Sequence, residues 1–188
     1  MIRASATVTI AALVAGACAC DRRPADAGVA PRRMADAIYT VLAADRTVYT
    51  QKVVNRLQDE QKVIKASEHF DEDKALPLPA QMFRMGAEVS AKRTSAFSYA
   101  LLSPWAINKQ NLPKTEAEKA GMAQVAQSGE NYYTEETLGG KRYFTAVYAD
   151  RAVAKACINC HNAHADSPRS DFKENDVMGG IVVRIALD

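Results

Sequence analysis

The chain has 188 residues, of which 48% are hydrophobic and 24% are charged, and its formal net charge is +2. This length and composition fit one globular domain with a core of ordinary size. Its Lys and Arg residues adjoin one another at most in pairs, such as Arg32-Arg33. We therefore expect no binding to nucleic acid, which needs a basic patch.

The first residues have the composition of an export signal. A positively charged start leads into residues 4–17, which are small and apolar, and Cys18 and Cys20 follow. The apolar run is shorter than the roughly 20 residues that a membrane-spanning helix needs, so we predict that residues 1–20 are a signal peptide. Cys18 or Cys20 is then either the lipidated first residue of a lipoprotein or part of an ordinary cleavage site. We expect a periplasmic or cell-envelope protein whose only membrane attachment is such a lipid anchor.

A tether, a long helix and an irregular stretch are predicted next. Residues 21–33 are polar and contain two prolines, which indicates a flexible linker. Over residues 34–67, apolar side chains recur at helical spacing without Pro or Gly, which predicts one long amphipathic helix. An acidic run followed by Pro77 and Pro79 predicts chain without regular structure over residues 70–80.

The remaining elements give the fold class. Thr115 and Glu118 form a capping-box pattern, which begins a helix ending near Gly121 or Gln127. In chain order we expect a helix over 80–92, a strand over 94–103 and then the helix from Thr115. Strands over 131–138 and 142–148 follow, joined by a turn at Gly139-Gly140. After a Cys/His loop, Gly179-Gly180 precede a closing strand over 181–185. Helices first and hairpin-spaced strands later predict an α+β domain with an antiparallel sheet.

One motif carries chemistry. Cys157-Ile158-Asn159-Cys160-His161 has the C-x-x-C-H pattern of c-type haem attachment. Two thiols three residues apart can reach both vinyl groups on one edge of a porphyrin, and the next residue can bind the iron. We therefore predict one covalently attached haem c at Cys157 and Cys160, with His161 as the proximal iron ligand.

Three other interpretations of this motif stay open. A zinc site needs four ligands, and only His69, His161 and His164 could complete the two thiols. A thioredoxin-like redox pair would need a βαβ unit, which the surrounding pattern does not predict. The third interpretation is coincidence.

Three blocks within residues 34–188 carry a resemblance to a known family. They are Lys92–Ser95 with Leu102–Asn108, Asn111–Pro113 and Glu118; then Tyr143-Phe144 leading to Cys157–His161; and last Ser167-Pro168, Asp171–Lys173 and Asp176–Gly180. Together these blocks resemble PAS-like c-type haem domains, which are small exported proteins or the sensor parts of histidine kinases and chemotaxis receptors. The resemblance implies a PAS-like antiparallel sheet flanked by helices, with a long N-terminal helix. The family's R-N-P motif reads Ser103-Pro104-Trp105 here, so the role of that arginine does not transfer.

The resemblance also suggests a ligand for the second face of the iron. Some relatives use a cysteine in a C-x-P-x-G pattern, and the similar stretch here is Met82–Gly86. Met82 is therefore the candidate distal ligand, with Met85 next to it, and core packing is the other interpretation of both. Further options are water or an open site, Tyr49, Tyr99 and His69.

Two functions follow from these expectations. The first is sensing of redox state or of NO or CO, which needs a separate signalling protein because the chain ends at Asp188 directly after its last strand. The second is one-electron transfer in the periplasm to a redox partner, which His/Met ligation favours. A peroxidase would need a distal His or Arg, and we find none, so we expect no enzymatic activity. The long helix is a candidate surface for a homodimer.

Overall fold

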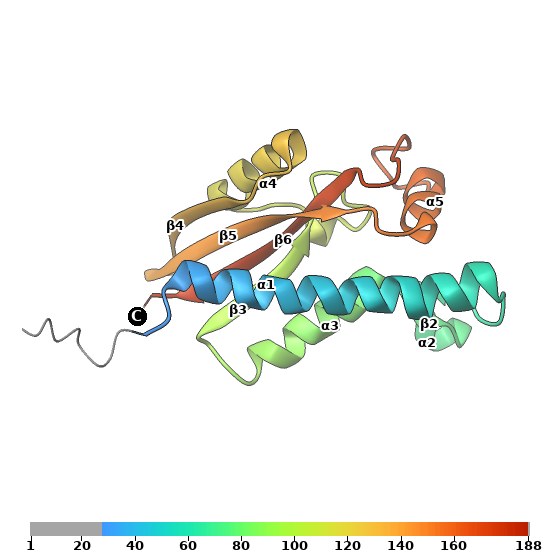
Figure 1. Cartoon of the computed structure of the whole chain (residues 1–188), viewed down its shortest axis with the longest axis horizontal. Coiled ribbons are helices and arrows are strands. Elements are labelled where there is room, and N and C mark those ends of the chain that lie inside the picture. Colours follow the sequence, from blue (N-terminus) through green and yellow to red (C-terminus); the bar gives the residue numbers. More distant parts are fainter. Residues whose placement is uncertain (1–27, 188) are drawn as a thin grey trace, which may run out of the picture.

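The computed structural model describes residues 28–187. The predicted signal peptide, Cys18, Cys20 and linker residues 21–27 lie outside the described residues. A long helix crosses the whole molecule (Figure 1): α1 (Pro31–Val48) continues without a break as the π-helix η1 (Tyr49–Glu60). The helix begins with a proline, whose missing N–H would have no intrahelical partner there.

The long helix is shorter at its end than the sequence predicted. It stops at Glu60 and not near Ser67, because Lys62 adopts a left-handed φ of 53° that no helix can accommodate. The amides of Val63 and Ile64 then turn back onto the carbonyl of Leu57. Neither Gly nor Pro marks this position, so no local stop signal was present to predict the end of the helix.

The segment after the long helix is also more regular than expected. The short helix α2 (Phe70–Asp73) is flanked by two-residue strands β1 (Ala66–Ser67) and β2 (Leu76–Pro77), which pair in parallel. Pro77 is tolerated in β2 because this two-stranded pairing leaves the strand at an edge. The prediction of irregular chain over residues 70–80 was therefore wrong for these elements.

Four antiparallel strands form the main sheet, in the order β3-β6-β5-β4. They are β3 (Phe97–Leu102), β4 (Tyr132–Leu138), β5 (Lys141–Arg151) and β6 (Val177–Ala186). Gly139 and Gly140, both with positive φ, make the β4–β5 turn as predicted. The expected α+β fold with an antiparallel sheet flanked by helices is confirmed.

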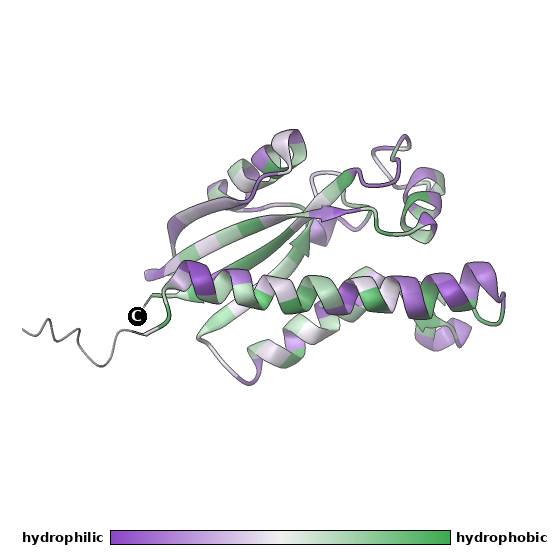
Figure 2. Ribbon diagram, in the orientation of Figure 1, coloured by the Kyte–Doolittle hydropathy of each residue, from purple (hydrophilic) through white to green (hydrophobic). Residues whose placement is uncertain are grey.

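Helices cover both faces of this sheet (Figure 1). One face packs against α1 and α3 (Pro79–Ala91) around Ala35, Phe83 and Tyr148. The other packs against α4 (Glu116–Ser128) around Met122 and Val125. The inner strands β5 and β6 are therefore buried on both faces, and Figure 2 shows their hydrophobic colouring.

The closing strand starts earlier than predicted. Gly179 and Gly180 lie inside β6 instead of preceding it, and a Cβ on Gly180 would stand 2.8 Å from the Met122 side chain and 3.0 Å from Val147. The glycines therefore serve close packing within the strand and do not form a turn. Helix α4 ends at Ser128, which confirms the expected end near Gln127 and not the one near Gly121, and Gly129 follows in the left-handed conformation.

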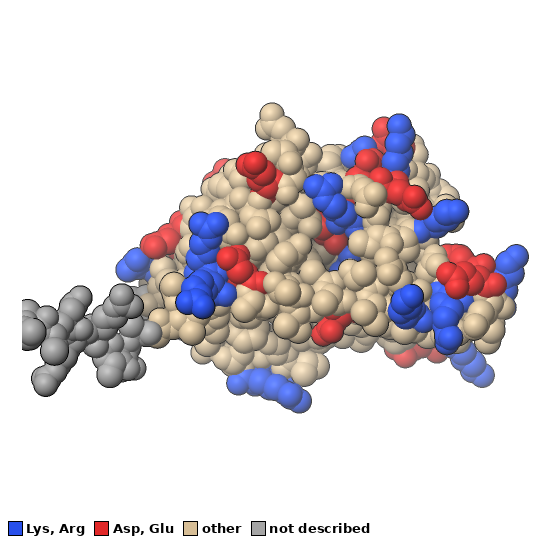
Figure 3. All heavy atoms as spheres, in the orientation of Figure 1, with Lys and Arg blue, Asp and Glu red and all other residues tan. Residues whose placement is uncertain are grey.

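The surface carries mixed charges. On the face shown in Figure 3, Lys/Arg and Asp/Glu side chains are interspersed. Within residues 28–187, no helix has the length and apolarity to span a bilayer.

Candidate functional site

The C-x-x-C-H motif lies on a helix and not in the predicted loop. Helix α5 (Lys155–Ala163) contains Cys157, Cys160 and His161. Residues at positions i, i+3 and i+4 of a helix lie on one face. The local fold therefore presents both thiols and the imidazole on the same side of α5, which the sequence spacing alone did not establish.

The two cysteines differ in their surroundings. Cys157 is half-buried against the small cluster of Ala152, Phe172 and Met178, whereas Cys160 is exposed, and both are free of disulfide bonds. Partial desolvation first, then the Glu68 carboxylate and Cys157, raise the pKa of the Cys160 thiol. Cys160 is therefore protonated at neutral pH.

His161 is held in its neutral form. Burial first, then the positive charge of Arg46 and the neighbouring His164, lower the pKa of His161. Its Nδ1 is buried and has no hydrogen-bond partner. A neutral imidazole has the free lone pair that a metal ligand needs.

Two neighbours fix the position of the His161 ring. Phe172 meets it edge-to-face, with ring centroids 5.9 Å apart. Asn162, the residue after His161, binds Phe172 twice: its Nδ2 donates to the Phe172 carbonyl (2.9 Å) and its Oδ1 accepts from the Phe172 amide (3.0 Å). Phe172 also contacts Trp105, and Arg169 stacks over both rings. These contacts hold the loop after α5 against α5, the helix that carries the C-x-x-C-H motif.

Helix α5 lies beside the end of the long helix (Figure 1). Just before α5, the carbonyl of Val153 accepts a hydrogen bond from Gln51 (3.0 Å). Earlier on the long helix, Arg46 Nη1 pairs with Asp150 Oδ1 at 2.7 Å. Burial raises the pKa of the Asp150 carboxyl, and Arg46 opposes this effect. These contacts attach the motif to the longest element of the fold.

The candidate distal ligand lies on a different helix. Met82 is half-buried near the start of α3, next to Gln81, whose Nε2 donates to the Glu68 carbonyl (2.7 Å). The Glu68 carboxylate in turn stands 3.8 Å from His164, at the end of α5. The structure therefore connects the start of α3 to the end of α5 through Glu68, and Met82 as a ligand stays a prediction.

The other candidates for the distal side are already engaged or exposed. Tyr49 donates its hydroxyl to the carbonyl of Pro77 (2.8 Å), and Tyr99 packs edge-on against Phe83. The His69 side chain is 67% exposed beside Glu68.

The residues present fit a covalently held haem better than a zinc ion. Within residues 28–187, no three His, Cys, Asp or Glu side chains form a group that could hold a metal ion, so the zinc interpretation lacks its ligand set. Two thiols that can form thioethers and one neutral imidazole that can bind iron, all on a single helix face, are the groups that c-type haem attachment uses. Two cavities of the described part of the chain have volumes of about 260 and 400 Å³, and neither is lined by these three residues.

Several residues of this site escaped sequence reasoning. Arg46 and Asp150 are 104 residues apart, and Asn162 and Phe172 meet only because a loop folds back onto α5. A charged residue among the inward-facing positions of an apolar helix, as at Arg46, is the one local signal that could have pointed to this region.

Comparison with known proteins supports the fold and gives the family. The family model described as Tll0287-like matches residues 25–186. The structure is similar to a crystal structure titled as that of the cyanobacterial heme-protein Tll0287, with a TM-score of 0.52 and 12% identity over 85% of this chain and 98% of that one. No curated protein matches the chain. Because the family model covers most of its length, this chain belongs to the Tll0287-like family.

Proposed function

We propose that this chain is an exported monohaem c-type protein that acts in sensing redox state or a small ligand such as NO or CO. The observation that carries the proposal is the common face of α5 on which Cys157, Cys160 and His161 lie. The family and the fold similarity to a protein described as a heme-protein add support. The proposal includes no enzymatic activity.

The residues of the chain have separate roles in this proposal. Cys157 and Cys160 hold the haem through thioether bonds, and His161 offers the lone pair of a neutral ring to the iron. Phe172, fastened by Asn162, keeps that ring in one orientation. When bound, the haem supplies a one-electron redox centre and a coordination position on iron.

Sensing is favoured by the contact between α5 and the long helix. The Gln51–Val153 hydrogen bond and the Arg46–Asp150 ion pair connect the chain around the motif to the helix 31–60. A movement of α5 would therefore change contacts along an element that spans the molecule. A separate signalling protein, or a second copy bound through this helix, would receive that change.

Electron transfer is the second candidate. Cys160 is exposed, so the porphyrin edge attached to it would lie near solvent, where a redox partner can approach. A six-coordinate iron that keeps both ligands in both oxidation states would favour this role, whereas five-coordinate iron that binds CO would favour sensing.

Haem attachment is the first test. The full chain, coexpressed with the cytochrome c maturation machinery, should yield a coloured protein that keeps its pigment through acid–acetone extraction. The double variant Cys157→Ala/Cys160→Ala should lose all covalent haem, and Asn159→Ala, an exposed substitution between them, should keep it. Colourless wild-type protein, or pigment removed by extraction, would overturn the proposal.

The distal ligand is tested by optical spectra of oxidised and reduced protein with and without CO. Met82→Ala should change the Soret band and raise CO affinity, while Met85→Ala, one turn along the same helix, should change neither. An unchanged spectrum in Met82→Ala would remove Met82 as a ligand.

We propose further that the protein is located in the periplasm or cell envelope. Cell fractionation tests the location. Mass spectrometry of the mature N-terminus separates lipidation at Cys18 or Cys20 from ordinary cleavage.

A further inference from the structure

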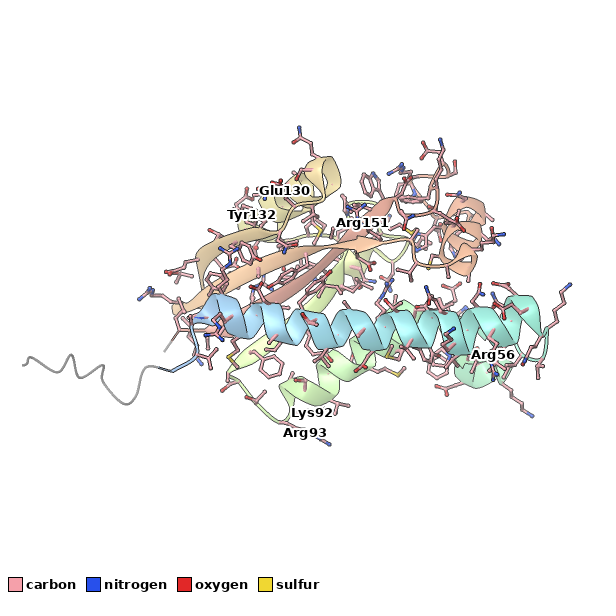
Figure 4. All side chains as sticks on the ribbon, in the orientation of Figure 1. Arg56, Lys92, Arg93, Glu130, Tyr132 and Arg151 are labelled. Carbon is pink, nitrogen blue, oxygen red and sulfur yellow. The ribbon has the colours of Figure 1, made fainter. Side chains whose placement is uncertain are left out.

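A polar cavity lies between the long helix and the end of β5, close to the candidate haem site. It has a volume of about 260 Å³, and its polar lining residues are Tyr39, Arg46, Thr47, Asn131, Asp150 and Arg151. Figure 4 shows Arg151 at the end of β5 that leads towards α5. The volume corresponds to about nine water molecules at roughly 30 Å³ each, which is enough for a small organic acid.

The first arginine that lines this cavity, Arg46, uses only part of its hydrogen-bonding capacity. The Arg46 side chain is 11% exposed and uses Nη1 to bind Asp150. Its Nε is buried and has no hydrogen-bond partner. Because Nε has no accessible surface, a ligand in the cavity would meet the guanidinium at its Nη atoms, which carry four of its five N–H donors.

The second arginine that lines the cavity, Arg151, is held by a backbone carbonyl. Arg151 donates from Nη1 to the Asn175 carbonyl at 2.8 Å. Its Nη2 occupies the space where a Cβ on Gly129 would lie, and Gly129 has a φ of 72° after the end of α4. The positive φ favours glycine at this position, and without a Cβ the flexible Arg151 side chain can lie against it.

The charges of the lining select the ligand. Two arginines and one aspartate give a net charge of +1, which a single carboxylate would neutralise. Ala43, Ala149 and Ile181 supply apolar contacts on the same cavity. Guanidinium groups bind carboxylates through paired, charge-assisted hydrogen bonds. We propose that this cavity is a carboxylate-binding site with Arg46 and Arg151 as its ligand-binding residues.

The carboxylate has two possible sources. One is a propionate of the haem, which rests on the proposed function, and the other is a free short-chain carboxylic acid. In either case the site adjoins the helix that carries the motif, because Val153, which also lines the cavity, lies two residues before α5.

The test uses the full, haem-loaded chain and the variant Arg151→Gln, because Arg151 is exposed and its loss leaves the Arg46–Asp150 pair intact. The matched control is Arg56→Gln, an exposed arginine towards the far end of the long helix (Figure 4). Thermal unfolding is followed against added acetate, propionate and butyrate at constant pH and ionic strength, with chloride as the reference. Resonance Raman spectra record the bending bands of the haem propionates.

Each outcome decides the proposal. Two results together support a free acid as the ligand. Added carboxylate raises the midpoint of thermal unfolding in wild type and in Arg56→Gln, and the affinity for the carboxylate is at least about tenfold weaker in Arg151→Gln. No rise, together with propionate bands that move only in Arg151→Gln, supports the haem propionate. If neither effect is observed, the proposal of a carboxylate site is overturned. If wild-type protein carries no covalent haem, the proposed function fails, and the free-acid titration still tests the cavity.

Discussion

Under α4 two buried glutamates share one arginine, whereas beside α5 a buried arginine binds one aspartate and keeps a nitrogen without a partner. Arg184 binds Glu118 through Nη2 and Glu136 through Nε, each at 2.7 Å. Glu118 also accepts from the amide of Thr115, and Glu136 from the Thr145 hydroxyl. Every charge in this network is paired and hydrogen-bonded, which is the condition for a stable buried ion group.

The region beside α5 follows a different rule. Within the described residues, the buried side-chain atoms without a hydrogen-bond partner are Arg46 Nε and His161 Nδ1, and both belong to this end of the molecule. Buried polar groups in folded proteins are nearly always paired, so such exceptions mark sites with a further role. The polar groups under α4 satisfy one another, whereas the region beside α5 retains polar groups that can bind a further partner.

The largest loss of stability is expected when the network of Glu118, Arg184 and Glu136 is broken. Arg184→Met leaves the Glu118 and Glu136 carboxylates buried without their cation, so we expect a loss of about 3–5 kcal/mol in the free energy of unfolding. Urea denaturation measures it. The triple variant Glu118→Gln/Arg184→Met/Glu136→Gln, which removes all three charges, should recover most of the loss. A cost below about 1 kcal/mol for Arg184→Met would show that the network is not structural.

The pH dependence of stability should come from the same network. Burial alone would raise the pKa of Glu118 and of Glu136. Hydrogen bonds outweigh this effect: Glu118 accepts them from Arg184 and backbone amides, and Glu136 from Thr145 and Arg184. Both pKa values are therefore lowered. A carboxyl group with a lowered pKa in the folded state contributes stability above its unfolded pKa of about 4.3 and loses it as the pH falls through the folded pKa. Wild-type stability should therefore decline as the pH falls below about 4.3.

The triple variant is the control for this titration. Its free energy of unfolding should change less between pH 6 and pH 3 than that of wild type, by a margin on the order of 1 kcal/mol or more. Parallel pH profiles for the two proteins would contradict the assignment of acid sensitivity to Glu118 and Glu136.

A smaller loss of stability is expected in the region beside α5. Asn162→Ala removes both hydrogen bonds to the Phe172 backbone, so we expect a loss of about 1–2 kcal/mol and greater mobility of the His161 ring. Asn159→Ala, exposed on the same helix, is the control and should cost less than about 0.5 kcal/mol. Urea denaturation gives the first quantity, and the electron paramagnetic resonance g-values of the haem-loaded protein report the second. Equal spectra for the two variants would show that Asn162 does not position the ring.

Local patterns determined much of this fold from the sequence. The helix beginning at Glu116 was predicted because its capping box, Thr115 with Glu118, forms within one turn. The β4–β5 hairpin was predicted because Gly-Gly readily adopts two consecutive positive φ values. The C-x-x-C-H motif predicted its chemistry from the spacing of three side chains, which needs no tertiary information.

Tertiary packing decided the rest. The long helix ends at Glu60 because Lys62 turns back, and Gly179 and Gly180 belong to a strand because Met122 and Val147 press against Gly180. No local propensity encodes these contacts. The surroundings of His161 likewise come from residues distant in sequence, since Arg46 reaches this region from the long helix and Phe172 from the following loop. The sequence predicted which atoms bind a cofactor, and only the packed structure decided how those atoms are buried, charged and held.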